Sequence, residues 1–163
     1  MLPKYIFAIL IFLILSCATV QRDIPYPPGM EFYDNARFEF RILIPKSFHK
    51  QLSQNGDGIT LTSPQNKNVE IRAWGSHNAL FQTFEEEVAE IHKGEKLLSI
   101  QDTHFQSIKG KVILMEEKNQ KIMRLVSLHN EIFYGVECSA PTREFTRYQK
   151  LFENIIQSFK LIN

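Results

Sequence analysis

The chain has 163 residues, of which 44% are hydrophobic and 12% are aromatic, and its 19 basic and 18 acidic side chains leave a formal net charge of +1. This length suits one domain that is large enough to bury a substantial core. A near-neutral chain has no basic stripe to neutralise phosphates, so neither nucleic acid nor a charged lipid surface is expected as an electrostatic partner.

Residues 1–17 have the pattern of an export signal. Lys4 supplies a positive charge, and residues 5–15 form an unbroken apolar run. At about 1.5 Å per residue this run reaches roughly 17 Å, which is too short for the roughly 30 Å of a bilayer's hydrocarbon core. Its length fits the apolar region of a secretory signal peptide instead.

The end of this run resembles the lipobox of bacterial lipoproteins. Residues 14–17 (ILSC) place an aliphatic residue three positions before a cysteine and a small residue directly before it. The resemblance implies that residues 1–16 are a lipoprotein signal peptide, that they are removed, and that acyl chains on Cys17 hold the protein on a membrane. It also implies a bacterial cell-envelope protein whose domain lies outside the cytoplasm. Ala18, rather than Asp, after the cysteine resembles lipoproteins sorted to the periplasmic side of an outer membrane, where the cell has one. The alternative is an uncleaved apolar leader with an incidental cysteine.

A proline-rich segment follows the lipobox. Its prolines at positions 25, 27 and 28 prevent a helix and favour an extended spacer of about 3.1 Å per residue. Residues 17–30 are therefore expected to form a lipidated cysteine with its tether, and residues 31–163 to form the folded domain.

The first half of this domain has the alternation of β-strands. Apolar residues recur with a period of two over residues 38–44 before Pro45 ends the run. Residues 59–63 and 69–74 are typical of a hairpin. The Asn-Gly-Asp-Gly sequence at 55–58 predicts a turn before it, because glycines permit positive φ.

A helix is expected after the hairpin. Thr83 can cap it, Glu86 stands three residues later as in a capping box, and Gly94 is expected to end it. The run at 112–115 is apolar on both faces and is expected to lie near the centre of the sheet. Four further strands are predicted over residues 97–105, 111–116, 122–128 and 132–138, with antiparallel neighbours joined by turns near Gly110, Asn119 and Asn130.

The last predicted element is a helix from Thr142 or Arg143 to Phe159. A helix with an apolar stripe buries that stripe against a sheet. The predicted fold class is therefore α+β, with an antiparallel β-sheet of about six strands flanked by helices. The stripe, at helical offsets of three and four, consists of Phe145, Tyr148, Phe152, Ile155, Ile156 and Phe159.

This order of motifs resembles the PsbP-like fold group. The resemblance implies an α/β/α sandwich of the Mog/PsbP type over residues 31–163. The group contains accessory and binding proteins with unrelated partners and shares no catalytic motif, so the resemblance implies no catalytic residue. It rests on Phe-x-Phe-x-Ile-x-Ile-Pro (38–45), NGDGITLTSP (55–64), Ala73-Trp74-Gly75, the Thr-x-Glu-Glu helix start and the terminal Tyr-x-x-Leu-Phe-x-x-Ile-x-x-Ser-Phe helix.

The sequence offers few residues for chemistry. The five histidines are scattered, and the acidic run at 85–87 is explained by the positive end of a helix dipole. No catalytic residue, cofactor or metal site is therefore predicted. Cys138 has no partner in the chain once Cys17 is lipidated, so it is expected to be a buried thiol in a strand.

Trp74 is the one candidate for contact with a partner. On an alternating strand it shares a face with Glu70 and Arg72, and the polar residues His77 and Asn78 follow it. An aromatic residue with a polar rim is typical of protein-contact surfaces. The alternative is a tryptophan covered by a helix on the second face of the sheet.

Together these patterns predict a lipid-anchored accessory or binding protein of the cell envelope, without catalysis or cofactor. Its expected partners are a membrane, through the lipid on Cys17, and an unidentified envelope protein. The alternative is an envelope enzyme or small-ligand-binding protein with a cleft between sheet and helices. That alternative requires polar residues that converge on one pocket.

Overall fold

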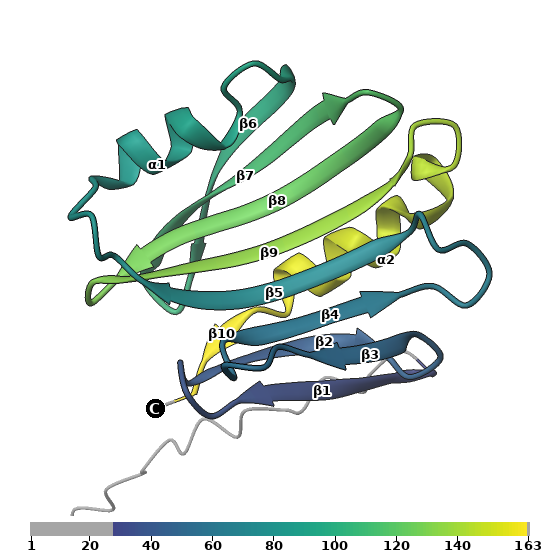
Figure 1. Ribbon diagram of the computed structural model, residues 1–163, viewed down its shortest axis with the longest axis horizontal. Coiled ribbons are helices and arrows are strands. Elements are labelled where there is room, and N and C mark those ends of the chain that lie inside the picture. Colours follow the sequence, from purple (N-terminus) through teal and green to yellow (C-terminus); the bar gives the residue numbers. More distant parts are fainter. Residues whose placement is uncertain (1–27, 163) are drawn as a thin grey trace, which may run out of the picture.

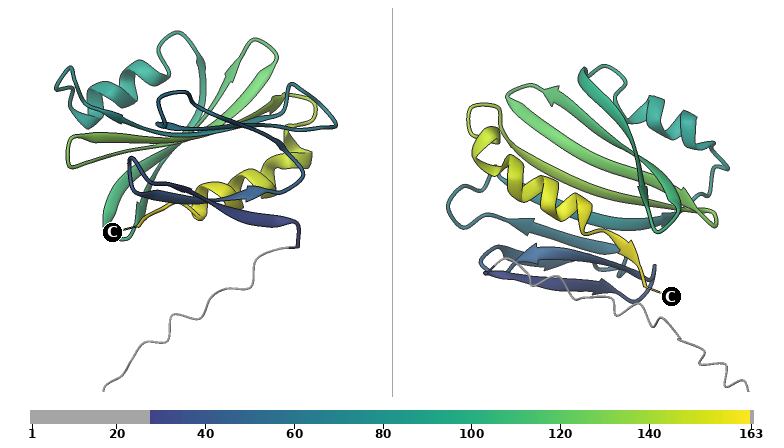
Figure 2. Two further views of the ribbon diagram at one scale, coloured as in Figure 1. Left: turned by 60° about the horizontal axis from the view of Figure 1, so that its bottom comes forward. Right: turned by 180° about the vertical axis from the view of Figure 1, so that it is seen from behind.

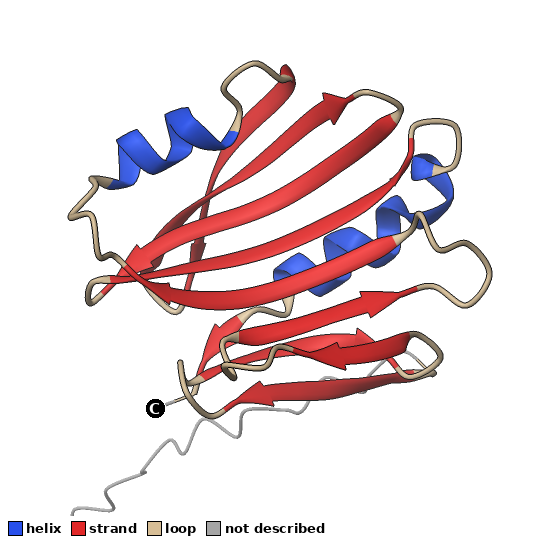
Figure 3. Ribbon diagram, in the orientation of Figure 1, coloured by secondary structure: helices blue, strands red, loops and turns tan. Residues whose placement is uncertain are grey.

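The computed structural model describes residues 28–162. The predicted signal peptide, Cys17 and most of the predicted tether lie outside the described residues. Figure 3 shows the helices in blue and the strands in red. In chain order the elements of residues 28–162 are β1 (Met30–Asn35), β2 (Phe40–Pro45), β3 (His49–Leu52), β4 (Gly58–Thr62), β5 (Glu70–His77), α1 (Phe84–Ile91), β6 (Lys96–Phe105), β7 (Ile108–Glu117), β8 (Gln120–His129), β9 (Ile132–Pro141), α2 (Phe145–Gln157) and β10 (Lys160–Leu161).

The strands of residues 28–162 form two antiparallel sheets. The large sheet has seven strands in the order β3-β4-β5-β9-β8-β7-β6, and the small sheet has three in the order β1-β2-β10. Strands β6 to β9 are ten residues each and follow one another as hairpins, which confirms the predicted run of antiparallel neighbours. The predicted hairpin is β4 with β5, in which Gly58 lies opposite Trp74.

The large sheet is the middle of three layers (Figures 1 and 2). On one face α1 covers β7 and β8 with a small cluster around Val88. On the other face α2 and the small sheet lie side by side and enclose the main core, which includes Phe40, Ile71, Val136 and Phe152. This arrangement confirms an α+β fold with a large antiparallel sheet flanked by helices.

The helix α2 buries the stripe that the sequence predicts. Five of its side chains are buried, and Phe159, which follows the helix, is buried as well. The ring of Phe152 lies 5.6 Å from that of Phe145 and 6.0 Å from that of Tyr148, measured between centroids. At roughly 1.5–3 kcal/mol for each buried side chain, this stripe is a major part of the force that holds α2 on the sheet.

The helix α1 begins with the predicted capping box. The hydroxyl oxygen of Thr83 accepts a hydrogen bond from the backbone N–H of Glu86 at 3.2 Å, and the Glu86 carboxylate accepts one from the backbone N–H of Thr83 at 2.7 Å. Gly94 does not end the helix directly; it has a φ of +83° in the turn after Ile91.

Three strands were not predicted, for physical reasons. All four residues of β3 are exposed, so no apolar face marks it in the sequence. β1 mixes polar and aromatic residues that are mostly half-buried, and β10 has two residues. These three strands form by pairing with a neighbouring strand at the edge of a sheet. Such pairing does not require that the edge strand itself alternates apolar and polar residues.

Two details of the predicted β6–β8 region are wrong. The turn lies at Gln106 and Ser107, both with left-handed φ (49° and 69°), while Gly110 lies within β7. The strand β7 is second from the edge of the sheet rather than central. Ile113 is buried below α1, whereas Val112 and Leu114 on the opposite face are only half-buried. That second face is partly uncovered.

Candidate functional site

Trp74 lies half-exposed on the outer face of β5, the face opposite the main core. Its ring packs on Gly135 of the neighbouring strand, where a Cβ atom in place of the glycine hydrogen would come within 2.2 Å of Trp74 Cζ2. The guanidinium of Arg124 lies 6.0 Å from the ring centroid, and Arg124 Nε donates to Glu137 at 2.7 Å. The helix on this face, α1, lies over β7 and β8 and not over β5 (Figure 1).

The other two predicted contact residues do not share a surface with Trp74. His77 is exposed but lies on the opposite face of β5, where its ring is 5.2 Å from that of buried Phe38. Asn78 is buried, and its side chain is used inside the following loop. The proposed role of Trp74, His77 and Asn78 in partner contact stays a prediction.

The loop that Asn78 holds presents two large apolar side chains to solvent. Leu80 is 78% exposed and Phe81 is 84% exposed; we call this pair the apolar knob. The Asn78 amide donates to the Gln82 carbonyl at 2.8 Å and accepts from the Gln82 backbone N–H at 2.9 Å. The backbone N–H of Asn78 also donates to the carbonyl of Glu131 at 2.9 Å. These bonds fix the base of the knob.

The backbone of the knob is in an unusual conformation. Phe81 has a φ of 52°, in the left-handed region that residues other than Gly, Asn and Asp rarely adopt. Left-handed backbone at a bulky residue costs free energy and persists where its surroundings enforce it. A buried side chain would explain this through packing, but Phe81 is exposed.

Acidic residues follow the knob in the chain and lie at the turn to which its base is bonded. Glu85 and Glu86 in the first turn of α1 are exposed, and Glu131 at the neighbouring turn is exposed as well. The backbone N–H of Thr83 donates to the Glu86 carboxylate and holds the pKa of that carboxyl below its usual range, with the Thr83 hydroxyl as a second donor. The rim of the knob is therefore negative at neutral pH.

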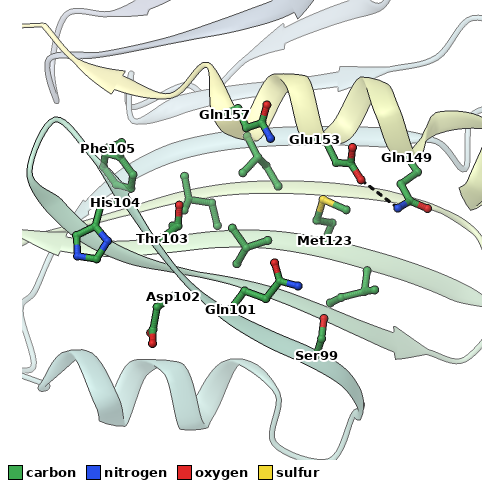
Figure 4. A pocket seen from close by; sticks show the side chains of 14 residues that line it. Ser99, Gln101, Asp102, Thr103, His104, Phe105, Met123, Gln149, Glu153 and Gln157 are labelled. Carbon is green, nitrogen blue, oxygen red and sulfur yellow. Dashed lines mark hydrogen bonds between the residues drawn. The ribbon is translucent and has the colours of Figure 1, made fainter.

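A second feature is a groove on the uncovered inner face of β6, β7 and β8 (Figure 4). It has a volume of about 450 Å³, within the range of ligand sites. Its floor is apolar and consists of Val112, Leu114, Met123 and Leu125. One wall is α2, through Gln149, Glu153, Ile156 and Gln157, and the other is β6, through Ser99, Gln101, Thr103 and Phe105.

One end of the groove is closed by the tip of the β6–β7 hairpin. The side-chain amide of Gln106 donates to the Leu161 carbonyl at 3.1 Å and accepts from the Leu161 backbone N–H at 2.8 Å. Next to it the rings of Phe105 and Phe159 meet edge to face at 4.9 Å. These contacts hold β6 at a fixed distance from the end of α2.

The groove lacks a pair of groups suited to acid–base chemistry. Asp102 and His104 point away from its floor (Figure 4), and Lys111 donates to Asp102 at 2.6 Å, which lowers the pKa of that carboxyl. Glu153 accepts a hydrogen bond from Gln149 at 3.0 Å. Polar groups therefore line the walls, but no acid and base face each other among the described lining residues.

Other chemistry finds little support in residues 28–162. Cys138 is buried in β9 as predicted, and burial raises the pKa of its thiol well above the usual value, which makes it a poor nucleophile. In this part of the chain no three His, Cys, Asp or Glu side chains gather in a way that would hold a metal ion. None of its helices has the length and apolar character needed to cross a bilayer.

The family model for PsbP matches residues 28–161. The chain belongs to the PsbP family. No curated protein matches it. This PsbP-family domain is similar in fold to the solution structure of cyanobacterial PsbP (CyanoP) from Synechocystis sp. PCC 6803, with a TM-score of 0.63 and 9% identity over 84% of this chain and 95% of that one.

Two bacterial crystal structures share the fold of this PsbP-family chain. One, from Bacteroides thetaiotaomicron VPI-5482, has a TM-score of 0.55 and 10% identity over 83% of this chain and 49% of that one. The other is PA94 from Pseudomonas aeruginosa, described as a protein of unknown function and putative regulator, with a TM-score of 0.50 and 9% identity over 80% of this chain and 95% of that one. At these identities the similarity concerns the fold alone.

Proposed function

We propose that this PsbP-family chain is a lipid-anchored, non-catalytic interaction module of the bacterial cell envelope. In this proposal acyl chains on Cys17 hold it on a membrane, on the periplasmic side of the outer membrane where one exists. The domain presents the apolar knob to another envelope protein. The observation that carries the proposal is the knob itself, in which Leu80 and Phe81 are 78% and 84% exposed on a loop fixed by Asn78.

A rigid loop that exposes a phenylalanine and a leucine is suited to insertion into a pocket. Burying the two side chains on a partner would contribute roughly 1.5–3 kcal/mol each. Because Asn78 already fixes the loop, little conformational entropy would be lost on binding. Aromatic anchors of this kind dominate many protein interfaces.

The charge around the knob supports a protein rather than a bilayer as its target. Glu85, Glu86 and Glu131 give the rim a negative charge, which the head groups of anionic lipids would repel. An apolar pocket with basic residues at its edge is the complementary surface. The knob also lies at the opposite end of the molecule from the start of β1, so a tether before β1 would leave it directed away from the anchoring membrane (Figure 1).

The test of the docking role is site-specific photo-crosslinking in intact cells. A benzophenone side chain replaces Phe81 or, as a matched control, Leu52, which is 65% exposed on β3. We expect one discrete adduct from position 81 that is absent from position 52. The captured protein is then purified, and Phe81→Ser is expected to weaken its binding at least about tenfold. Equal adducts from both positions, or unchanged affinity of Phe81→Ser, would contradict the docking role.

The anchor has a separate test. Cys17→Ser is expected to abolish labelling by radioactive palmitate and to release the protein from membranes, because the acyl chains supply the membrane affinity. Labelling that survives the substitution would show that the anchor lies elsewhere. The knob could still act in a protein anchored by another route.

A further inference from the structure

We propose that the groove between β6 and α2 binds an extended peptide segment of a partner protein. The segment lies lengthwise in the groove with apolar side chains on the floor and a basic side chain beside Glu153. This site uses none of the residues of the apolar knob, so either proposal can fail without the other.

The shape of the groove favours an extended chain. The wall on β6 runs from Ser99 to Phe105, about 20 Å at about 3.3 Å per residue. The wall on α2 runs from Gln149 to Gln157, about 12 Å at about 1.5 Å per residue. A site of this length matches roughly four to six residues of extended peptide, whereas a compact small molecule would leave part of it empty.

The floor supplies an apolar surface for alternate side chains of such a peptide. Val112 and Leu114 on β7 are half-buried, and Met123 and Leu125 on β8 lie behind them. Half-buried aliphatic side chains lose further contact with water when a ligand covers them, which is the main source of binding free energy in apolar sites. Methionine adapts its shape to different side chains, so the floor tolerates more than one apolar residue.

The walls match the polar backbone of a peptide. Gln101 on β6 faces Gln149 and Gln157 on α2 across the groove (Figure 4). A carboxamide both donates and accepts hydrogen bonds, so such walls pair with the N–H and C=O groups of a peptide backbone.

The strand β6 adds a free edge to this arrangement. In residues 28–162 it pairs with β7 on one side, and no strand pairs with its other side. Peptides often bind by adding to an edge strand of this kind. Exposed apolar residues accompany the edge: Leu97 is 41% exposed, Leu98 is 39% exposed at the β-bulge and Ile100 is 37% exposed. Leu97 and Ile100 pair with Met115 and Ile113, which pack below α1, so these two side chains lie on the face of β6 opposite the groove floor.

The charges select the class of peptide. The lining residues among those described include no lysine or arginine, so an anionic ligand such as a fatty acid or a phosphate finds no countercharge. Glu153 is a carboxylate on the wall, and its nearest cation is Lys150 at 3.8 Å on the same helix. Asp102 is already paired with Lys111 at 2.6 Å. A lysine or arginine of the ligand therefore finds its partner at Glu153.

The test measures binding of a capped, fluorescein-labelled hexapeptide of alternating leucine and lysine to the full-length chain in phosphatidylcholine nanodiscs, with empty nanodiscs as the blank. A hexapeptide with glutamate in place of lysine is the matched ligand control. We expect saturable binding of the leucine–lysine peptide with a Kd below about 100 μM, and binding of the glutamate peptide at least about tenfold weaker.

Three variants locate the binding. Glu153→Lys is expected to weaken binding at least about tenfold, whereas Glu90→Lys, its match on α1, is expected to change it less than about twofold. The two glutamates are comparable because Glu90 also lies three residues from a lysine, with Lys93, in the turn after α1, at 3.1 Å. Gln101→Trp fills the groove from an exposed position and is expected to abolish binding without lowering the melting temperature.

Four outcomes would overturn the proposal. The first is that binding does not saturate up to about 1 mM peptide, and the second is that Glu153→Lys and Glu90→Lys weaken peptide binding equally. The third is that a folded Gln101→Trp variant binds the peptide unchanged. The fourth is that the peptide fails to bind while octyl glucoside binds tightly and Gln101→Trp blocks it. The last outcome would assign the groove to a small amphiphilic molecule.

Discussion

The two helices of this domain form for different reasons. α1 has eight residues, a complete capping box, three acidic residues in its first turn and one buried residue, Val88. α2 has 13 residues, no side-chain cap at Glu144 and five buried residues. Local hydrogen bonds therefore specify α1, while burial against the sheet specifies α2. A helix without a cap is stable when its apolar face is buried, because tertiary packing outweighs the lost cap.

This difference predicts unequal stability across the molecule. α2 lies in the core that joins the large sheet to the small one, so its loss removes the interior of both. α1 covers a separate cluster of five buried residues on the far face. We expect α1 to open without the rest of the domain, as elements with few buried contacts do. Four substitutions test this comparison.

Phe152→Asp is expected to have the largest effect. Phe152 is fully buried at the centre of α2, so the change leaves a cavity and a buried charge and lowers the free energy of unfolding by more than about 4 kcal/mol. Circular dichroism in urea is expected to show no cooperative transition. Thr146→Asp, at an exposed position in the first turn of the same helix, is the control and is expected to change stability by less than about 0.5 kcal/mol. A folded Phe152→Asp variant would show that α2 is not essential to the core.

Val88→Asp is expected to separate α1 from the sheet while the domain stays folded. Val88 is the buried residue of α1, and its loss removes roughly 1.5–3 kcal/mol of burial. In hydrogen exchange, the amides of residues 84–91 are expected to lose protection while those of α2 keep theirs. Ala89→Asp carries the same charge on the exposed neighbouring residue and serves as the control. Global unfolding by Val88→Asp would contradict the independence of α1.

Thr83→Ala is expected to lower the free energy of unfolding by about 1 kcal/mol, because the helix cap is lost. Thr83→Ser keeps the cap and is expected to have little effect. Thr83→Ala also removes the Thr83 hydroxyl that donates to Glu86, so the pKa of that carboxyl is expected to rise toward its usual value. An NMR titration of the side-chain carbons measures this rise directly.

The capping box also has a predictable dependence on pH. The pKa of Glu86 is lower in the folded protein than in the unfolded chain, chiefly because the Thr83 backbone N–H donates to the carboxylate. Its contribution to stability is therefore complete above the unfolded value of about 4.3 and is lost as the pH falls through the lower folded value. A difference in stability between the parent and Glu86→Gln that does not shrink in acid would contradict this mechanism.

The sequence predicts the elements whose signals are local or periodic. The capping box at Thr83 and the apolar stripe of α2 both lie within a few residues of the structure they specify. The burial of Cys138 follows from its place in an apolar strand. The groove could not be predicted in this way, because it depends on the contact between Gln106 and Leu161, which are 55 residues apart in the chain. No local pattern encodes that distance.

The apolar knob has a weak signal in the sequence, which the predicted contact surface at Trp74 does not include. Leu80 and Phe81 stand between the end of a strand and a helix cap, where polar turn residues are usual. Both stand at helical offsets of four and three before Phe84, but they precede the cap at Thr83, so neither belongs to the helix or has an assigned place in the core. Apolar residues in a loop between two elements are candidates for contact residues. The left-handed φ of Phe81 cannot be recognised from the sequence at all.

Phe81→Gly is expected to have the smallest effect on stability, and it tests the loop at residues 78–83 that carries the apolar knob. Glycine adopts a φ of 52° without strain, so removing the phenylalanine side chain relieves strain of about 1–2 kcal/mol, part of which is offset by the greater entropy of the unfolded chain. We expect the free energy of unfolding to rise by up to about 1 kcal/mol while partner binding falls. Leu80→Gly, at a residue without positive φ, is expected to lower stability by about 0.4–1 kcal/mol. If Phe81→Gly raises the free energy of unfolding and Leu80→Gly lowers it, the loop keeps a strained phenylalanine at the expense of stability, as expected of a contact residue. If both substitutions lower the free energy of unfolding equally, Phe81 stabilises the fold.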